Sequence, residues 1–288
     1  MQSRPPRVLM PNSVHEALSM AAREPDAVYW AGGMAFKQQS GHGAVMKLPG
    51  TLIVLSRIEE LARVLRTERT LDIGSMTNLE RIAEIGRGFL PPGMQEAIAS
   101  TAVRPVRCMI SIGGHIAEKK KLGYLLPLLQ LLDAKVEVRF LRTRRGRVLS
   151  IPGNRKIPIA GFHDAASGLP HEALITRVSI PLHIWNAGQF IKVYPGGRDN
   201  PPFIFCGAAR VEKKVLMEVR LAFTDAQTGI FRDTELEASM AGRGLPLSNK
   251  DLQQLSNAVS RITANWIQPF NKAAAWDAVC GFFSRIIL

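Results

Sequence analysis

The sequence predicts an α+β protein built from two domains, the first of which has two lobes and the second of which is smaller. Helix-like and strand-like segments occur in both halves of the chain, and 46% of its 288 residues are hydrophobic, enough for a sizeable core. Two Gly-Gly pairs, Gly32-Gly33 and Gly113-Gly114, lie far apart in the sequence. Because successive backbone N–H groups in such turns form a concave anion site, the two pairs favour a ligand held between two lobes.

The domain boundary is predicted from a change in composition. Residues 153–170 are richer in glycine, proline and polar residues than their surroundings, which is typical of a connection. We therefore place a domain boundary near residues 165–173, with the first domain at residues 1–168 and the second at residues 169–288. The two lobes of the first domain are expected at about 1–56 and 57–168. The second domain is expected to combine an antiparallel sheet with helices.

The first domain is expected to begin with a helix over residues 15–23. Asn12 or Ser13 is the predicted N-cap, and Glu16, three residues after Ser13, has the spacing of a capping box. The next helix is predicted over residues 56–66, with Ile58, Leu61, Ala62 and Leu65 on one face. The remaining patterns predict strands at 27–30, 52–55, 70–74, 134–141 and 147–151, and helices ending near 85 and 99 and at 122–132.

The second domain contains four strand-like runs followed by three helices. Gly242 and Gly244 are expected to end the first of these helices, and Ser248 to cap the second. Arg220 and Glu237 are interpreted as an internal ion pair. The predicted strands are 174–181, 190–194, 203–211 and 216–223, and the predicted helices are 234–240, 250–269 and 273 to about 287.

Charge and cysteine content narrow the classes of function. The net charge of +13 suits nucleic acid, an acidic partner or an anionic cofactor, but no nucleic-acid-binding motif accompanies it. The basic run 142–147 lies between two strand-like segments and is interpreted as a hairpin turn. Cys108, Cys206 and Cys280 show no metal-ligand spacing and are expected to be buried free thiols. The chain lacks an apolar signal core or membrane span, so a cytoplasmic protein is expected.

Several motifs occur together in one order. Ala31-Gly32-Gly33 follows a strand, Ile73–Thr77 lies in the middle of the first domain, and Arg107–Ala117 contains the second Gly-Gly pair. In the second domain stand Lys192, Cys206–Ala209, Val219–Phe223 and Arg232–Gly242. In this order and spacing the motifs resemble the FAD-binding medium subunit of molybdenum-containing hydroxylases. That family includes the medium subunit of carbon monoxide dehydrogenase and the flavin domain of xanthine dehydrogenase.

The resemblance implies an oxidoreductase flavoprotein subunit that works only with partner subunits. Its fold would be a two-lobed FAD-binding domain of the PCMH type, followed by a carbon monoxide dehydrogenase flavoprotein C-terminal domain. A large subunit would hold molybdopterin and oxidise the substrate, and a small subunit would hold two [2Fe-2S] clusters. FAD in this chain would pass the electrons to an acceptor. Because the redox chemistry would belong to the flavin, we assign no catalytic acid or base and no metal ligand to the chain.

The resemblance also implies a cofactor site. The four glycines of the two pairs would hold the diphosphate. His115 is a candidate for a changed phosphate contact, the alternative being an isolated histidine on a surface loop. The candidate cofactor-binding residues are Ala31, Gly32, Gly33, Met34, Thr77, Ser111, Ile112, Gly113, Gly114, His115, Tyr124 and Lys192.

This sequence departs from the family within that site. Met34 stands where the family usually has Thr or Ser, which removes a hydrogen bond of about 1.5–3 kcal/mol to a charged group. His115 replaces Asn or Asp, Tyr124 replaces Asp, and Lys119-Lys120-Lys121 replaces a loop of small residues and proline. Two alternatives therefore stay open: a flavin-poor or flavin-free relative with a structural role in such a complex, and, in another class, a basic module that binds anions or nucleic acid.

Overall fold

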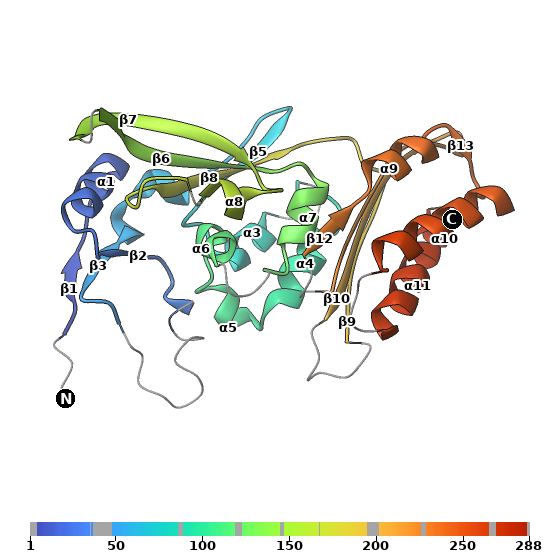
Figure 1. Cartoon of the computed structure of the whole chain (residues 1–288), viewed down its shortest axis with the longest axis horizontal. Coiled ribbons are helices and arrows are strands. Elements are labelled where there is room, and N and C mark those ends of the chain that lie inside the picture. Colours follow the sequence, from blue (N-terminus) through green and yellow to red (C-terminus); the bar gives the residue numbers. More distant parts are fainter. Residues whose placement is uncertain are drawn as a thin grey trace. The chain divides into compact units, whose positions relative to one another are not determined.

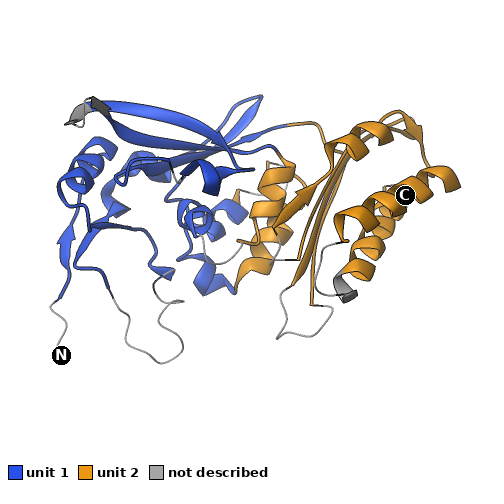
Figure 2. Cartoon of the chain, in the orientation of Figure 1, with its two compact units in different colours: residues 1–84, 103–119, 133–182 blue, residues 85–102, 120–132, 183–288 orange. Residues whose placement is uncertain are grey.

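The structure, a computed structural model, describes residues 5–34, 36, 48–85, 89–118, 123–144, 147–166, 168–194, 202–225, 229–264 and 269–286. Its contacts divide the chain into two compact units (Figure 2). Unit 1 comprises residues 1–84, 103–119 and 133–182, and unit 2 comprises residues 85–102, 120–132 and 183–288. The domain boundary after residue 168 stays a prediction.

Unit 1 begins with a small parallel sheet and one helix. Strands β1 (Arg7–Leu9), β2 (Val28–Trp30) and β3 (Thr51–Val54) pair in the order β1-β3-β2. Helix α1 (Val14–Arg23) has the predicted cap, because the Ser13 hydroxyl accepts from the Glu16 N–H and the Glu16 carboxylate accepts from the Asn12 N–H. The apolar face of α1 packs on buried Ile53 and Leu55.

The second sheet of unit 1 is antiparallel, with strand order β4-β5-β8-β6-β7 (Figure 1). Alternate residues such as Ile73, Val136 and Val178 are fully buried, as expected for a sheet with one face on a core. The predicted hairpin is confirmed, since β6 and β7 pair from Lys135 with Pro158 to Arg144 with Arg147. The strands are β4 (Val64–Arg66), β5 (Thr70–Gly74), β6 (Lys135–Arg144), β7 (Arg147–Pro158) and β8 (Leu174–Pro181), and the helices are α3 (Leu79–Glu84), α5 (Arg104–Arg107), α6 (Ile112–Ala117) and α8 (Phe162–Ala166).

The helix predicted over residues 56–66 is wrong. The segment forms two short 3₁₀ helices, η1 (Leu55–Arg57) and η2 (Glu59–Ala62), and then strand β4. Ile58 and Leu61 are buried, but Leu65 is 51% exposed, so no single apolar face is formed. Antiparallel pairing of β4 with β5 therefore overrides the local helical pattern.

Unit 2 is built around an antiparallel sheet with strand order β12-β11-β10-β9, with β13 paired to β11. Phe203, Phe205 and Phe223 of the sheet form its core with helices α10 and α11, which lie together in Figure 1, while α7 contacts β10 and β11. The predicted α+β class with an antiparallel sheet in the second half is confirmed. The strands are β9 (Ala187–Val193), β10 (Phe203–Glu212), β11 (Val215–Thr224), β12 (Ile230–Arg232) and β13 (Arg243–Gly244), and the helices are α4 (Met94–Thr101), α7 (Leu126–Leu131), α9 (Thr234–Met240), α10 (Asn249–Ile262) and α11 (Pro269–Arg285).

The core of unit 2 contains a buried ion pair. Glu237 pairs with Arg232 at 2.9 Å, and its carboxylate also accepts from the Leu221 N–H at 2.9 Å. Arg220 donates to Glu218 and to the carbonyl oxygen of Leu131. Its pairing with Glu237 stays a prediction. Arg232 reaches Glu237 because it lies at the end of β12, just before the first turn of α9 that carries Glu237.

The burial of the three cysteines differs from the prediction. Cys206 is buried as expected, but Cys108 is exposed and Cys280 is intermediate, so the prediction of three buried thiols is wrong. Cys108 follows the short helix α5, which buries none of its own residues.

In the part of the chain that the structure describes, no helix combines the length and apolar composition needed to cross a membrane.

Candidate cofactor site

The middle motif and the second Gly-Gly motif are joined by backbone hydrogen bonds within unit 1. The Gly113 N–H donates to the Ser75 carbonyl at 2.9 Å, and the Ile112 N–H donates to the Thr77 carbonyl at 3.0 Å. Ser111 is the N-cap of α6. The second Gly-Gly pair is therefore the first turn of a helix, anchored on the loop that follows β5, rather than a separate tight turn.

Three glycines of the site lie so close to neighbouring atoms that a side chain would not fit. A Cβ on Gly32 would overlap the carbonyl oxygen of Met109, and a Cβ on Gly113 would lie 2.7 Å from the Cβ of Ser75. Gly33 has a φ of +70°, and a Cβ there would meet the Trp30 ring. At Gly32 and Gly113 side chains are excluded by the close approach of neighbouring loops, and at Gly33 by the Trp30 ring and the positive φ.

The two Gly-Gly pairs differ in what their N–H groups bind. The Gly113 N–H is used by Ser75, and the Gly114 N–H donates to the Ser111 hydroxyl oxygen at 3.2 Å. Among the described residues, the N–H groups of Gly32 and Gly33 have no hydrogen-bond partner. The first pair, which follows β2, therefore offers backbone donors that no other described residue uses, whereas the donors of the second pair are engaged within the protein.

A cavity of about 370 Å³ lies within unit 1 beside these loops. Four of the predicted site residues line it, namely Ala31, Ser111, Gly113 and Gly114. The remaining lining residues were not predicted as site residues, and they are Tyr29, Leu55, Ser75, Met76, Ala117, Val138, Phe162, His163, Ala166, Leu169, Pro170, His171, Ala173, Leu174 and Ile175.

The chemistry of this cavity is mixed. Its wall is mainly aliphatic and aromatic, and the Tyr29 hydroxyl at its edge donates to the Glu172 carbonyl at 2.6 Å. Burial, aided by the Glu172 carboxylate, raises the pKa of Tyr29, so the phenol stays neutral. The hydroxyls of Ser75 and Ser111 lie beside the glycine loops. The cavity thus suits a ligand with an apolar ring at one part and hydrogen-bond acceptors at another.

The other predicted site residues lie outside the lining of this cavity. Thr77 and Ile112 hold the loops together, and Met34 follows the first Gly-Gly pair. Tyr124 and Lys192 belong to unit 2, where the Lys192 ammonium lies 3.6 Å from the centre of the Tyr124 ring and donates to the Ser100 carbonyl at 2.7 Å. Their contact with a cofactor stays a prediction, and the lysine run 119–121 lies outside the described residues.

His115 follows the second Gly-Gly pair on α6 but does not line the cavity. Burial lowers the pKa of His115 from 6.5 to about 4, so its imidazole is neutral at neutral pH. His115 therefore brings no positive charge to a phosphate, and its contact with a cofactor stays a prediction.

The depressed pKa of His115 makes stability depend on pH. The unfolded chain protonates this histidine near pH 6.5 and the folded chain only near pH 4. Its contribution to the free energy of unfolding is therefore fully present above pH 6.5 and is lost as the pH falls to 4. We expect His115→Gln to reduce the loss of unfolding free energy between pH 7 and 4.5 by on the order of 2 kcal/mol in urea titrations. The exposed His15→Gln is the control, and an unchanged slope in His115→Gln would contradict the assignment.

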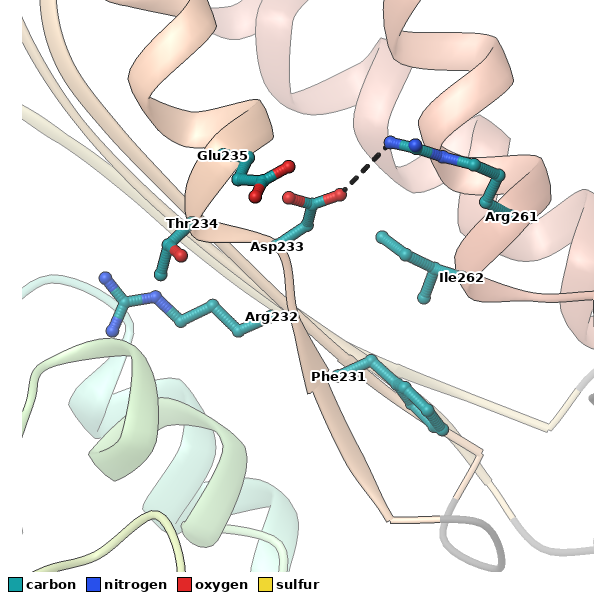
Figure 3. Close-up of a pocket in the computed structure, with 7 residues that line it drawn as sticks. All are labelled: Phe231, Arg232, Asp233, Thr234, Glu235, Arg261 and Ile262. Atoms are coloured by element: carbon teal, nitrogen blue, oxygen red, sulfur yellow. Dashed lines mark hydrogen bonds and ion pairs between the residues drawn. The ribbon is translucent and has the colours of Figure 1, made fainter.

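A second concavity occurs in unit 2, at the start of α9 (Figure 3). Asp233 caps α9 by accepting from the Leu236 N–H, and Arg261 of α10 reaches the same carboxylate at 3.4 Å (dashed in Figure 3). Its polar groups thus serve the packing of two helices. Among the described residues, no three His, Cys, Asp or Glu side chains gather in a way that would hold a metal ion.

Comparison with known protein families shows the class to which this chain belongs. The family described as "FAD binding domain in molybdopterin dehydrogenase" matches residues 3–183, which is more than half of the chain. The chain belongs to this family of oxidoreductase flavoproteins. The family predicted from the motifs is therefore confirmed, and FAD is the cofactor of that family.

Two curated relatives match shorter stretches. The Escherichia coli K12 protein YgfM is 31% identical over 127 residues, covering 44% of this chain and 46% of YgfM. Subunit alpha of the 6-hydroxypseudooxynicotine dehydrogenase complex of Paenarthrobacter nicotinovorans is 30% identical over 142 residues, covering 47% and 44%. The matched part of the chain spans less than half the length of these two relatives.

Two solved structures share the fold over nearly the whole chain. A chain of quinoline 2-oxidoreductase from Pseudomonas putida 86 has a TM-score of 0.76 at 16% identity and covers 100% of both chains. A chain of carbon monoxide dehydrogenase from Hydrogenophaga pseudoflava has a TM-score of 0.75 at 20% identity and covers 99% of this chain and 98% of that one. At such identities the likeness establishes the fold.

Proposed function

We propose that this chain is the FAD-binding electron-transfer subunit of a molybdopterin-dependent hydroxylase or dehydrogenase. It would receive electrons from the [2Fe-2S] clusters of a small partner subunit and pass them through FAD to an acceptor. A large partner subunit would hold molybdopterin and oxidise the substrate. The membership of the family and the name of the Paenarthrobacter relative, a subunit of a dehydrogenase complex, support this proposal.

The cavity in unit 1 is the observation that carries the proposal. Its apolar and aromatic wall, with Tyr29 and Phe162, suits an adenosine. The free N–H groups of Gly32 and Gly33, close to the cavity-lining Ala31, suit the anionic oxygens of a diphosphate. The residues present therefore fit the adenosine diphosphate half of FAD, and Gly32 and Gly33 would hold it through their backbone.

FAD, when bound, supplies the redox chemistry, and the protein supplies binding and orientation. The buried wall formed by Leu55, Val138 and Leu174 would exclude water from the adenosine. The neutral phenol of Tyr29 would avoid repulsion of the diphosphate, because it carries no negative charge. No side chain of this chain is assigned a proton-transfer step.

A flavin-poor subunit is the second candidate. It is favoured by the engaged N–H groups of Gly113 and Gly114 and by the position of Lys192, whose ammonium is held by Tyr124 and the Ser100 carbonyl. Such a subunit would retain the fold and assemble with the same partners without carrying electrons.

FAD uptake decides between the two candidates. We expect the purified full chain, alone or assembled with its partner subunits, to take up one FAD per chain, seen as flavin absorbance and quenched flavin fluorescence. Gly114→Val should weaken uptake about tenfold or more, because its side chain would enter the lining of the cavity, with its Cβ 3.0 Å from the Ser111 hydroxyl oxygen. Gly50→Val is the control, since no atom lies within 4 Å of a Cβ there.

Two results would count against the first candidate. The absence of saturable FAD uptake in both the isolated chain and the assembled complex would leave the flavin-poor subunit as the function. Equal FAD affinity in Gly114→Val and the wild type would remove the cavity of unit 1 from the site.

A further inference from the structure

Ser75 is fixed between a strand and a helix of unit 1. Its N–H donates to the Thr176 carbonyl of β8 at 3.0 Å, and its carbonyl accepts from the Gly113 N–H of α6 at 2.9 Å. A Cβ on Gly113 would lie 2.7 Å from the Cβ of Ser75, so the Ser75 side chain faces the second Gly-Gly pair. Ser75 is 4% exposed and lines the cavity. Its position is therefore set by backbone contacts and does not depend on its hydroxyl.

The hydroxyl of Ser75 has no hydrogen-bond partner among the described residues. Other hydroxyls of unit 1 are paired: Thr77 donates to the Ala62 carbonyl, Thr176 to the Glu137 carboxylate and Ser179 to Asp72. A buried hydroxyl without a partner costs free energy, of order 1–3 kcal/mol, that an acceptor on a ligand would recover. The Ser75 hydroxyl is thus an independent indication of a ligand acceptor at this wall of the cavity.

The first Gly-Gly pair, which follows β2, is not followed directly by a residue with a hydroxyl group. Gly33 is followed by Met34, whose thioether is at most a weak acceptor and is unable to donate to a phosphate. Ser75 is a hydroxyl donor on the facing loop, hydrogen-bonded directly to the second Gly-Gly pair through its carbonyl. Because Ser75 is neutral and its backbone is already satisfied, it would bind an anionic oxygen without rearrangement of the loops.

We infer that the Ser75 hydroxyl donates a hydrogen bond to a phosphate oxygen of the bound dinucleotide and takes the role of the hydroxyl that Met34 does not provide. This inference rests on the proposed function, because it takes a dinucleotide diphosphate as the ligand of the cavity. It makes Ser75 a binding residue of the site in addition to those implied by the motifs.

The test compares Ser75→Ala with Ser179→Ala by calorimetric titration of the flavin-free full chain with FAD, ADP and adenosine. Ser75→Ala should weaken FAD and ADP about 10- to 100-fold and leave adenosine unchanged, because only the first two carry phosphates. Ser179→Ala, which removes a paired hydroxyl away from the cavity, should leave all three affinities unchanged.

Thermal unfolding of the same ligand-free proteins gives a second readout. The midpoint of Ser75→Ala should equal or exceed that of the wild type, because an unpaired hydroxyl is removed. The midpoint of Ser179→Ala should be lower, because its hydrogen bond to Asp72 is lost. Opposite signs in the two variants separate a ligand-binding hydroxyl from one that stabilises the fold.

The outcomes separate this inference from the proposed function. If Ser75→Ala binds FAD and ADP as the wild type does, or loses adenosine as strongly as ADP, the inference is overturned and the proposed function stands. If the wild type binds ADP but not FAD, the proposed function fails, and the Ser75→Ala comparison on ADP still decides the inference. A wild type that binds neither FAD nor ADP overturns both.

Discussion

Replacing Gly32 with alanine is expected to lower the free energy of unfolding by about 3 kcal/mol and to abolish FAD uptake. The added Cβ would overlap the carbonyl oxygen of Met109, which is backbone and has no alternative rotamer. The loop that follows β2 must then move away from the loop that precedes α6. This movement would displace the free N–H groups of Gly32 and Gly33 together with Ala31, which lines the cavity.

Gly50→Ala is the matched control for this change. It also adds one methyl group to a glycine of unit 1, but no atom lies within 4 Å of the new Cβ. Since alanine restricts the unfolded chain more than glycine does, Gly50→Ala should leave stability unchanged or raise it by up to about 1 kcal/mol. Urea unfolding and FAD titration measure both variants. Equal stability of Gly32→Ala and Gly50→Ala would show that the close approach at Met109 is not required.

The parts of the fold that could be predicted are those fixed by local chemistry. Helix α9 was predicted at its observed bounds because Gly242, with a φ of +81°, marks its end. The Ser248 cap of α10 is confirmed and forms a capping box with Asp251. Strand β4 was not predicted, because it forms by pairing with β5 and its residues have the apolar spacing of a helix over 56–66.

The candidate site could be predicted only where backbone packing requires glycine. Gly32 and Gly113 could be predicted as site residues, because the close approach of neighbouring atoms requires glycine there and each belongs to a Gly-Gly motif in the sequence. Residues 153–170 were interpreted as a connection, although they contain half of β7 and all of α8 and contribute Phe162 and His163 to the cavity. These side chains could not be predicted, because only the folding of β7 and α8 brings them beside Ser75, about ninety positions earlier in the chain.

The Arg232–Glu237 pair is the second place where a single change should have a large effect. Both side chains are largely buried, with exposed fractions of 13% and 8%, and three nitrogen–oxygen distances between them lie between 2.9 and 3.1 Å. Arg232 also donates to the Gln130 carbonyl near the end of α7. The pair therefore ties α9, β12 and α7 together in unit 2, and removal of one partner leaves a buried charge without its counter-charge.

Glu237→Gln is expected to lower the free energy of unfolding by about 3–5 kcal/mol, measured by urea unfolding. Glutamine still offers an acceptor to the Leu221 N–H, so the loss reports the charge of the pair and not that backbone hydrogen bond. Glu84→Gln is the control, because its partners Arg81 and Arg104 are about 70% exposed, and it should cost less than about 1 kcal/mol.

Combining Glu237→Gln with Arg232→Met should restore part of the stability lost in Glu237→Gln, because the double variant also removes the buried guanidinium that has lost the Glu237 carboxylate. The recovery would be incomplete, since the hydrogen bond from Arg232 to Gln130 at the end of α7 is lost as well. If the double variant is less stable than Glu237→Gln by the full cost of Arg232→Met alone, the two side chains act independently. In that case the buried charge is not the cause of the loss.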